Sequence, residues 1–237
     1  MCYHKSQTTS ADKLGDYYQA RYSAAVAEQA QIRFHESGFA HLSTPVTTVQ
    51  LPSELQLMSW GLIPWWVKSW NDAKTLRIQT LNCISEEMAS KASYRDSVKH
   101  GKRCLIPCTG FYEWQHVGKD KLPHYIYLKN QTLFSLAGLY SDWTNKETGQ
   151  EVLSYTVLTT SANALMEEIH NSKKRMPVII PREHEKDWLS DRLNIDDVTA
   201  LCRPLDPGLM QAHRISKMIT DRKIENKNVA QVNEPLM

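Results

Sequence analysis

The chain of 237 residues is 41% hydrophobic, a length and composition that suit a globular protein with one large packed core. Its 28 basic and 26 acidic residues leave a formal net charge of +2, which excludes nonspecific binding of nucleic acid through bulk positive charge. No apolar run approaches the ~18 residues of a membrane span, and the start of the chain lacks the pattern of a signal peptide. We therefore expect a cytoplasmic protein without membrane contact.

Five cysteines are spread along the chain, at Cys2, Cys83, Cys104, Cys108 and Cys202. An odd number of cysteines without an export signal favours reduced thiols over a disulfide framework. Cys104 and Cys108 lie in the alternating stretch "CLIPC", but no second cysteine or histidine pair stands at zinc-ligand spacing. We predict no metal and no cofactor.

The first predicted element is a helix over 10–30, with Ser10 as its N-cap. Apolar residues recur there at helical spacing, at Leu14, Tyr18, Tyr22 and Val26. The apolar period then changes to that of β-strands. Strands are predicted over 55–66, 103–117, 124–130, 132–143 and 151–160, with turn-prone groups between several of them.

Further helices are predicted between and after these strands. One spans 85–101, with acidic residues at its start and Gly101 as its stop, and another spans 161–170 with Ser161 as its cap. The remaining predicted elements are a strand over 176–180, helices over 183–193 and 195–202, and a strand within 213–219. The tail from about residue 222 is polar enough to be partly irregular. The simplest account is an α+β fold: one domain over 1–237, with a mostly antiparallel, barrel-like β-sheet flanked by helices.

Cys2 directly follows the initiator methionine. Removal of Met1 would leave a free α-amine and a thiol on adjacent carbons, a 1,2-aminothiol. Such a pair can condense with an aldehyde to an imine and then close a thiazolidine ring. A cysteine at position 2 can equally be an accident of sequence, so other residues must support this chemistry.

Three polar residues stand where packing alone would not place them. Asn82 lies between an extended segment and a helix, where a helix N-cap is the alternative role. Glu113 interrupts the aromatic strand "GFYEW"; in a cleft it would gain proton affinity and suit a general base, but it can also face solvent. His170 ends a helix, where the dipole favours its protonated form and an acid role, although a surface or capping histidine is equally compatible.

The stretch "WGLIPWW" holds Trp60, Trp65 and Trp66 around a glycine and a proline. This pattern does not suit an amphipathic helix. Read locally it favours a core turn, and stacking on nucleobases is the alternative.

Taken together, "MC", "WGLIPWW", Asn82 in an N-x-x-SE pattern, "CLIPCTGFYEW" and "IH" followed by "RMPVII" resemble the SRAP family in order and spacing. These SOS response-associated peptidases are also described as abasic-site processing proteins. The resemblance runs from Cys2 to about Pro181.

The resemblance implies a SRAP domain that binds single-stranded DNA containing abasic sites. It implies a thiazolidine cross-link between the N-terminal cysteine and the ring-opened aldehyde, with autocatalytic removal of Met1 and abasic-site lyase activity. Cys2 would be the nucleophile, Asn82 the orienting residue, Glu113 the base and His170 the acid. A bacterial member would be associated with the nucleoid, and we expect a monomer without an obligate protein partner.

DNA contacts are the part of the resemblance where this sequence departs from the family. Arginines that grip phosphate in family members are replaced here by His4 and Ile84. Two lysines extend the motif after His170, and we expect them to restore some of the lost charge. The candidate DNA-binding residues are Trp60, Trp66, Arg95, Arg103, Trp114, Lys173, Lys174 and Arg175.

Two other functions remain open on the residues alone. The first is an N-terminal cysteine hydrolase or peptidase that uses Cys2 with His170 and no DNA. The second is a non-catalytic module that binds single strands through the tryptophans and basic residues, in which Cys2 is incidental.

Overall fold

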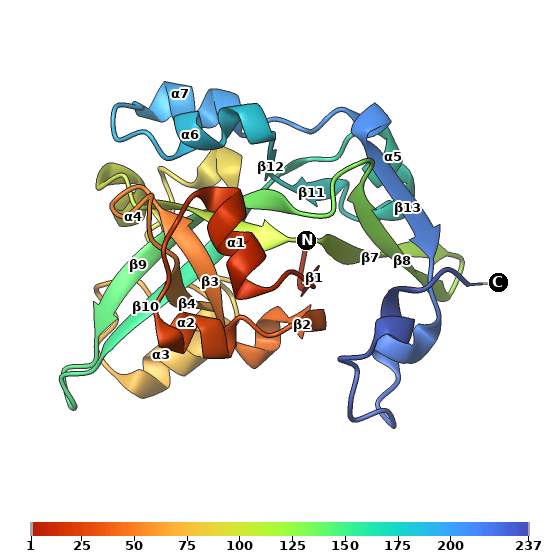
Figure 1. The fold of residues 1–237 in the computed structure, drawn as a ribbon, viewed down its shortest axis with the longest axis horizontal. Helices are drawn as coiled ribbons and strands as arrows, with labels where there is room; N and C mark the ends of the chain where they lie inside the picture. The colour runs from red at the N-terminus through yellow and green to blue at the C-terminus, as the bar shows by residue number, and fades with distance from the viewer. Residues whose placement is uncertain (1, 237) are drawn as a thin grey trace.

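The computed structural model describes residues 2–236 and confirms the predicted α+β fold with a barrel-like sheet (Figure 1). Five strands form a closed ring in which each is hydrogen-bonded to the next. In ring order they are β10 (Glu151–Ser161), β4 (Gln56–Trp60), β3 (Ser43–Thr48), β6 (Arg103–Cys108) and β9 (Phe134–Thr144). Only the β10–β4 pairing within this ring is parallel.

Three short strands extend the barrel sheet. They are β5 (Asn82–Ile84), parallel to β10, β11 (Arg175–Pro177), antiparallel to β10, and β12 (Ile179–Ile180), antiparallel to β9. Thr159 of β10 pairs with both Ile84 and Pro177, so the segments that follow Asn82 and His170 flank the same part of β10.

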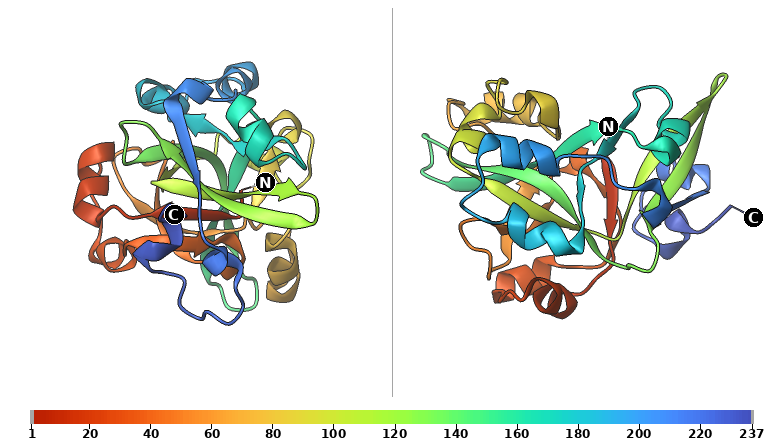
Figure 2. Two further views of the ribbon diagram at one scale, coloured as in Figure 1. Left: turned by 90° about the vertical axis from the view of Figure 1, so that its right-hand side faces the viewer. Right: turned by 90° about the horizontal axis from the view of Figure 1, so that it is seen from above.

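A second, fully antiparallel sheet brings the N-terminus beside the middle of the chain. Its strands, in order, are β13 (Met210–Arg214), β8 (Asp120–Leu128), β7 (Gly110–Val117), β1 (His4–Gln7) and β2 (Arg33–Ser37). Figures 1 and 2 show this sheet beside the barrel, with the C-terminal segment on its side of the molecule. β6 and β7 were predicted as one strand. They are separate because the chain changes sheets at Thr109, between Cys108 and Gly110.

The helices are short. Most of them cover the outside of the barrel, whereas α5 (Ala164–Ile169) lies against β7 of the second sheet (Figure 1). They are α1 (Ala11–Tyr18), α2 (Ala24–Gln29), α3 (Trp70–Arg77), α4 (Arg95–Lys99), α5 (Ala164–Ile169), α6 (Glu185–Trp188) and α7 (Ile195–Leu201). Among residues 2–236, no helix has the length and apolar character needed to cross a membrane.

Several predicted boundaries were wrong. The helix over 10–30 is two helices, because the chain turns at Gln19 in the left-handed region (φ 52°), although Ser10 does cap the first. The segment 85–101 holds only a 3₁₀ turn and α4. α5 is capped by Asn163 rather than Ser161, because Ser161 is still paired in β10.

The end of the chain also differs from its predicted pattern. The predicted strand within 213–219 ends at Arg214, and the next segment is a 3₁₀ turn over Lys217–Thr220. Beyond it the described chain holds one more 3₁₀ turn, Ala230–Asn233, which buries Val232 completely. The tail is therefore irregular in secondary structure but packed onto the second sheet.

Candidate functional site

Cys2 lies inside the molecule, two residues before the start of β1. Its side chain is fully buried in the main hydrophobic cluster, and its thiol donates a long hydrogen bond to the carbonyl of His4 (3.7 Å). Burial raises the pKa of the thiol well above its usual value, and the charges of Glu113 and Cys108 raise it further. The thiol is thus protonated near neutral pH. The predicted removal of Met1 concerns a residue outside the described part of the chain.

Glu113 is held on β7 beside Cys2, and its side chain is almost fully buried. β7 can begin tightly against β8 because Gly110 has no side chain: a Cβ there would lie 2.2 Å from the Tyr125 ring. Loss of solvation raises the pKa of Glu113 from its usual 4.5 to about 7. A carboxyl with this pKa can both accept and donate a proton near neutrality.

His170 faces Glu113 from the C-terminal end of α5. The ring Nδ1–H donates to the carbonyl of Arg175 (2.7 Å), which fixes the tautomer because a carbonyl can only accept. Nε2 then points toward Glu113, 3.9 Å from Oε2. The expectation that the helix end favours protonated His170 was wrong: α5 has only six residues, and burial lowers the pKa of the ring.

Asn82 begins β5 and is not a helix cap, because the following 3₁₀ turn is capped at Ile84 without a side-chain bond. Its carbonyl accepts a hydrogen bond from the Tyr94 hydroxyl (3.0 Å). Both polar atoms of its side chain are buried, and neither has a hydrogen-bond partner among residues 2–236. Buried amides are rarely left in this state, which makes this side chain a candidate ligand-binding group.

Arg175 connects the segments that carry His170 and Asn82. Its carbonyl accepts from His170, while its guanidinium donates to both carboxylate oxygens of Glu86 (2.8 and 2.7 Å). Glu86 lies in the turn that follows β5. The structure thus brings Cys2, Glu113 and His170 together and holds the Asn82 segment against the His170 segment. Such a group supplies a nucleophile, a proton carrier and a hydrogen-bonding amide.

Comparison with known proteins adds independent evidence. The model of the family described as SOS response associated peptidase (SRAP) matches residues 1–222. The chain belongs to this family.

Two SRAP relatives carry names that bear on function. The chain is 37% identical over 173 residues to abasic site processing protein YoqW of Bacillus subtilis (strain 168), covering 72% of this chain and 73% of that protein. It is 31% identical over 188 residues to abasic site processing protein HMCES of Xenopus tropicalis, covering 71% of this chain and 54% of that protein.

A crystal structure of a protein from Bacteroides thetaiotaomicron is also similar. It superimposes with a TM-score of 0.93 at 33% identity, and all of both chains is covered. The arrangement of both sheets is therefore that of a solved protein.

The aromatic residues of this SRAP protein divide into buried and exposed groups. Trp60 was wrongly predicted to contact DNA: it is fully buried, its indole N–H donates to the carbonyl of Leu81 (2.7 Å), and its ring stacks on Tyr155. Trp66 is 42% exposed and Trp114 is partly exposed, so both rings are accessible.

Sequence reasoning did not single out Trp65 or Phe39 as surface residues. They are 59% and 50% exposed. The Phe39 ring lies 5.2 Å from the ring of Tyr3, which follows Cys2. The doubled tryptophan of "WGLIPWW" was a usable signal for Trp65, whereas nothing in the local sequence marks Phe39.

The basic residues predicted to bind DNA also fall into a buried or engaged group and an exposed group. Arg103 was wrongly placed at a DNA groove: it is buried, and its guanidinium donates to the carbonyls of Trp188 (3.1 Å) and Ser190 (2.5 Å). Lys173 and Lys174 are exposed in the loop between α5 and β11, next to His170, and Arg95 is exposed at the start of α4. Arg175 is mostly covered and engaged with Glu86.

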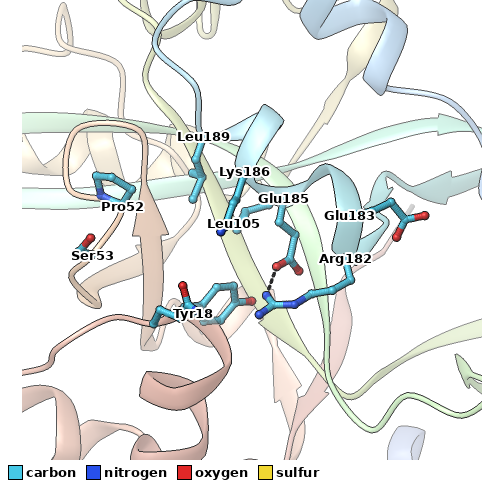
Figure 3. A pocket seen from close by; sticks show the side chains of 10 residues that line it. Tyr18, Pro52, Ser53, Leu105, Arg182, Glu183, Glu185, Lys186 and Leu189 are labelled. Atoms are coloured by element: carbon cyan, nitrogen blue, oxygen red, sulfur yellow. Dashed lines mark hydrogen bonds and ion pairs between the residues drawn. The ribbon is translucent and has the colours of Figure 1, made fainter.

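A pocket of about 600 Å³ lies elsewhere on the SRAP fold, between the turn at Pro52 and α6 (Figure 3). Its wall includes a bonded network in which buried Glu185 accepts from Arg182, Tyr17 and Ser135. None of Cys2, Asn82, Glu113 and His170 lines this pocket, so it gives no support to a small-substrate hydrolase built on Cys2. Among residues 2–236 no cluster of three or more histidine, cysteine or acidic residues could hold a metal ion.

Proposed function

We propose that this SRAP protein processes abasic sites in single-stranded DNA by forming a covalent adduct through Cys2 after removal of Met1. The observation that carries the proposal is the buried Glu113–His170 pair beside Cys2, with a carboxyl that titrates near neutrality. The relatives named abasic site processing proteins support the choice of substrate.

The first step is condensation of the amine with the aldehyde. The α-amine of Cys2 adds to the carbonyl carbon of the ring-opened deoxyribose, and water leaves to give an imine. An α-amine has a pKa of roughly 7.7–8, so a useful fraction is neutral at cellular pH. Glu113 as carboxylate takes the proton that the amine loses, and in its acid form returns it to the departing hydroxyl. The Asn82 side-chain amide, which has no hydrogen-bond partner among residues 2–236, is suited to hold the aldehyde oxygen.

The second step closes the ring. The Cys2 sulfur adds to the imine carbon, and its proton passes to the nitrogen, which gives a thiazolidine. Because the thiol starts protonated, it needs an acceptor, and Glu113 is positioned to relay this proton. The net reaction joins one aldehyde to one aminothiol and releases one water.

The same site can support two further activities, which we include in the proposal. From the imine, a base removes a proton from the adjacent sugar carbon and the 3′ phosphate leaves, which is β-elimination and therefore lyase chemistry. Neutral His170 is the candidate base, because its Nε2 is the acceptor nitrogen in this tautomer. Hydrolysis of the Met1–Cys2 peptide bond would be a self-processing peptidase step that releases the amine.

The test uses intact mass and adduct chemistry on the full chain. Protein shown by mass to lack Met1 is mixed with an oligonucleotide containing one abasic site. We expect an adduct with the mass of both components minus one water, resistant to heat and hydroxylamine. Cys2→Ser should give an imine that persists only after borohydride reduction, because a hydroxyl closes the corresponding ring poorly.

Two outcomes would contradict the proposal. One is an adduct that forms equally fast in protein retaining Met1, since the amine would then not be the reacting group. The other is wild-type binding and activity on abasic strands in Cys2→Ala, which would identify the protein as a binding module in which Cys2 is incidental.

A further inference from the structure

The segment 223–236 lies beyond the residues that the family model matches, yet it is fixed to the second sheet. The side chain of Asn228 accepts from the backbone N–H of Phe34 (2.7 Å) and donates to the carbonyl of Ile32 (3.2 Å). The carbonyl of Asn233 accepts from His213, and the backbone N–H of Leu236 donates to the carbonyl of Arg214 (2.8 Å). Asn228 therefore fixes this segment against β2, next to His35.

The face of β2 that carries His35 leads to Cys2. His35 Nε2 lies 2.9 Å from Nδ1 of His4, and the two rings stack with centroids 5.1 Å apart. The His4 ring also packs edge-on against Trp114 (5.2 Å), and the carbonyl of His4 receives the Cys2 thiol. A ligand at Cys2 that extends over Trp114 would pass this histidine pair.

Lys227, the residue before Asn228, brings a positive charge to the pair. Burial lowers the pKa of His4 to about 3 and of His35 to about 4, and the Lys227 ammonium contributes to both shifts. Both imidazoles are thus neutral at cellular pH. Lys227 forms no ion pair with a carboxylate of residues 2–236, so its charge is not neutralised within the described protein.

We propose that the C-terminal segment supplies Lys227 as a phosphate-binding residue, which holds a backbone phosphodiester of the single strand beside the His4–His35 pair. This inference rests on the proposed function, because it assumes that a DNA strand crosses the Cys2 site. An unneutralised ammonium near neutral, partly covered rings attracts a polyanion without holding a specific base.

The test compares three variants of the full chain: Lys227→Gln, Lys227→Arg and the matched control Lys223→Gln. Lys223 is an exposed lysine of the same segment. Affinity for intact and for abasic single strands is measured from about 50 to about 200 mM salt. We expect Lys227→Gln to bind both strands roughly three- to tenfold more weakly and to reduce the salt slope by about 0.7. Lys227→Arg and Lys223→Gln should match the wild type.

The rate of adduct formation at saturating abasic strand separates this inference from the function on which it rests. Lys227→Gln should keep the wild-type rate there, because binding alone is altered. Wild-type affinity and salt slope in Lys227→Gln, with a normal Cys2 adduct, would overturn the role of Lys227 and leave the proposed function intact. A slower rate of adduct formation at saturating abasic strand, with an unchanged salt slope of binding, would also overturn the role of Lys227. Failure of the wild type to bind or cross-link DNA would reject both.

Discussion

At the scale of the residue, the protonation state of Glu113 is set by its burial. Its side chain is 4% exposed, and the pKa rises from 4.5 to about 7. The folded protein therefore holds this proton more tightly than the unfolded chain does. The favourable contribution is complete below pH 4.5 and is lost as the pH rises through about 7. Above that pH, the buried carboxylate destabilises the fold.

Glu113→Gln should therefore stabilise the protein at alkaline pH while impairing its chemistry. At about pH 8 we expect the free energy of unfolding to rise by up to roughly 3 kcal/mol, and near pH 4.5 we expect little change. Urea unfolding at both pH values measures this, with exposed Glu28→Gln as the control. Equal free energies of unfolding for Glu113→Gln and the wild type at the higher pH would show that the buried carboxylate does not destabilise the fold.

At the scale of the element, β1 must hold Cys2 in place, and a buried ion pair sets its pairing. Lys5 and Glu36 face each other across β1 and β2, both side chains are fully buried, and Nζ lies 3.0 Å from Oε2. A buried pair contributes little net stability, but it strongly penalises any arrangement that separates the two charges. This pair therefore favours one register of β1 against β2. Lys5 is only three residues after Cys2, so the same register also places Cys2.

We predict a large difference between single and double replacements of this pair. Lys5→Met should lower the free energy of unfolding by about 3–5 kcal/mol, because Glu36 is left buried and uncompensated. Lys5→Met with Glu36→Leu should recover most of that loss. Urea unfolding measures both, and Arg21→Met, which breaks the exposed Arg21–Glu54 pair, should cost under about 1 kcal/mol. A double variant no more stable than the single one would contradict this account.

At the scale of the whole molecule, the described chain beyond the family match packs onto the second sheet without adding a strand to it. Val232 is fully buried in a cluster with Tyr112, Tyr125, Ile215 and Ile219. The same segment satisfies the edge of β2 through Asn228. Removing it would expose an apolar patch and unpaired backbone groups close to the Cys2 site.

A chain ending at residue 222 should therefore be less stable than the full chain. We expect the free energy of unfolding to fall by about 2–4 kcal/mol, from the lost burial of Val232 and the lost hydrogen bonds to β2. Val232→Ala in the full chain should account for roughly 1–2 kcal/mol of this. Denaturant midpoints of the full chain, the shortened chain and Val232→Ala measure these differences in stability. An unchanged midpoint in the shortened chain would mean that the segment adds nothing to the fold.

The sequence by itself determined the fold class and the positions of most later strands, and it raised the hypothesis that a cysteine at position 2 is reactive. These follow from local properties: apolar periodicity, turn residues, and the chemistry of an amine next to a thiol. The strands β1, β2 and β3 were not predicted, because their short, polar segments gain their burial only by pairing with distant strands.

Tertiary structure decided which candidate residues can take part in the site. Trp60 and Trp66 are six positions apart in one motif, but only Trp66 reaches the surface, because β4 closes the barrel and buries Trp60. Arg103 became a structural donor because α6 ends against β6. The pKa of His170 falls rather than rises because burial outweighs the effect of a six-residue helix. Burial and hydrogen-bond partners come from segments far along the chain, and no local pattern records them.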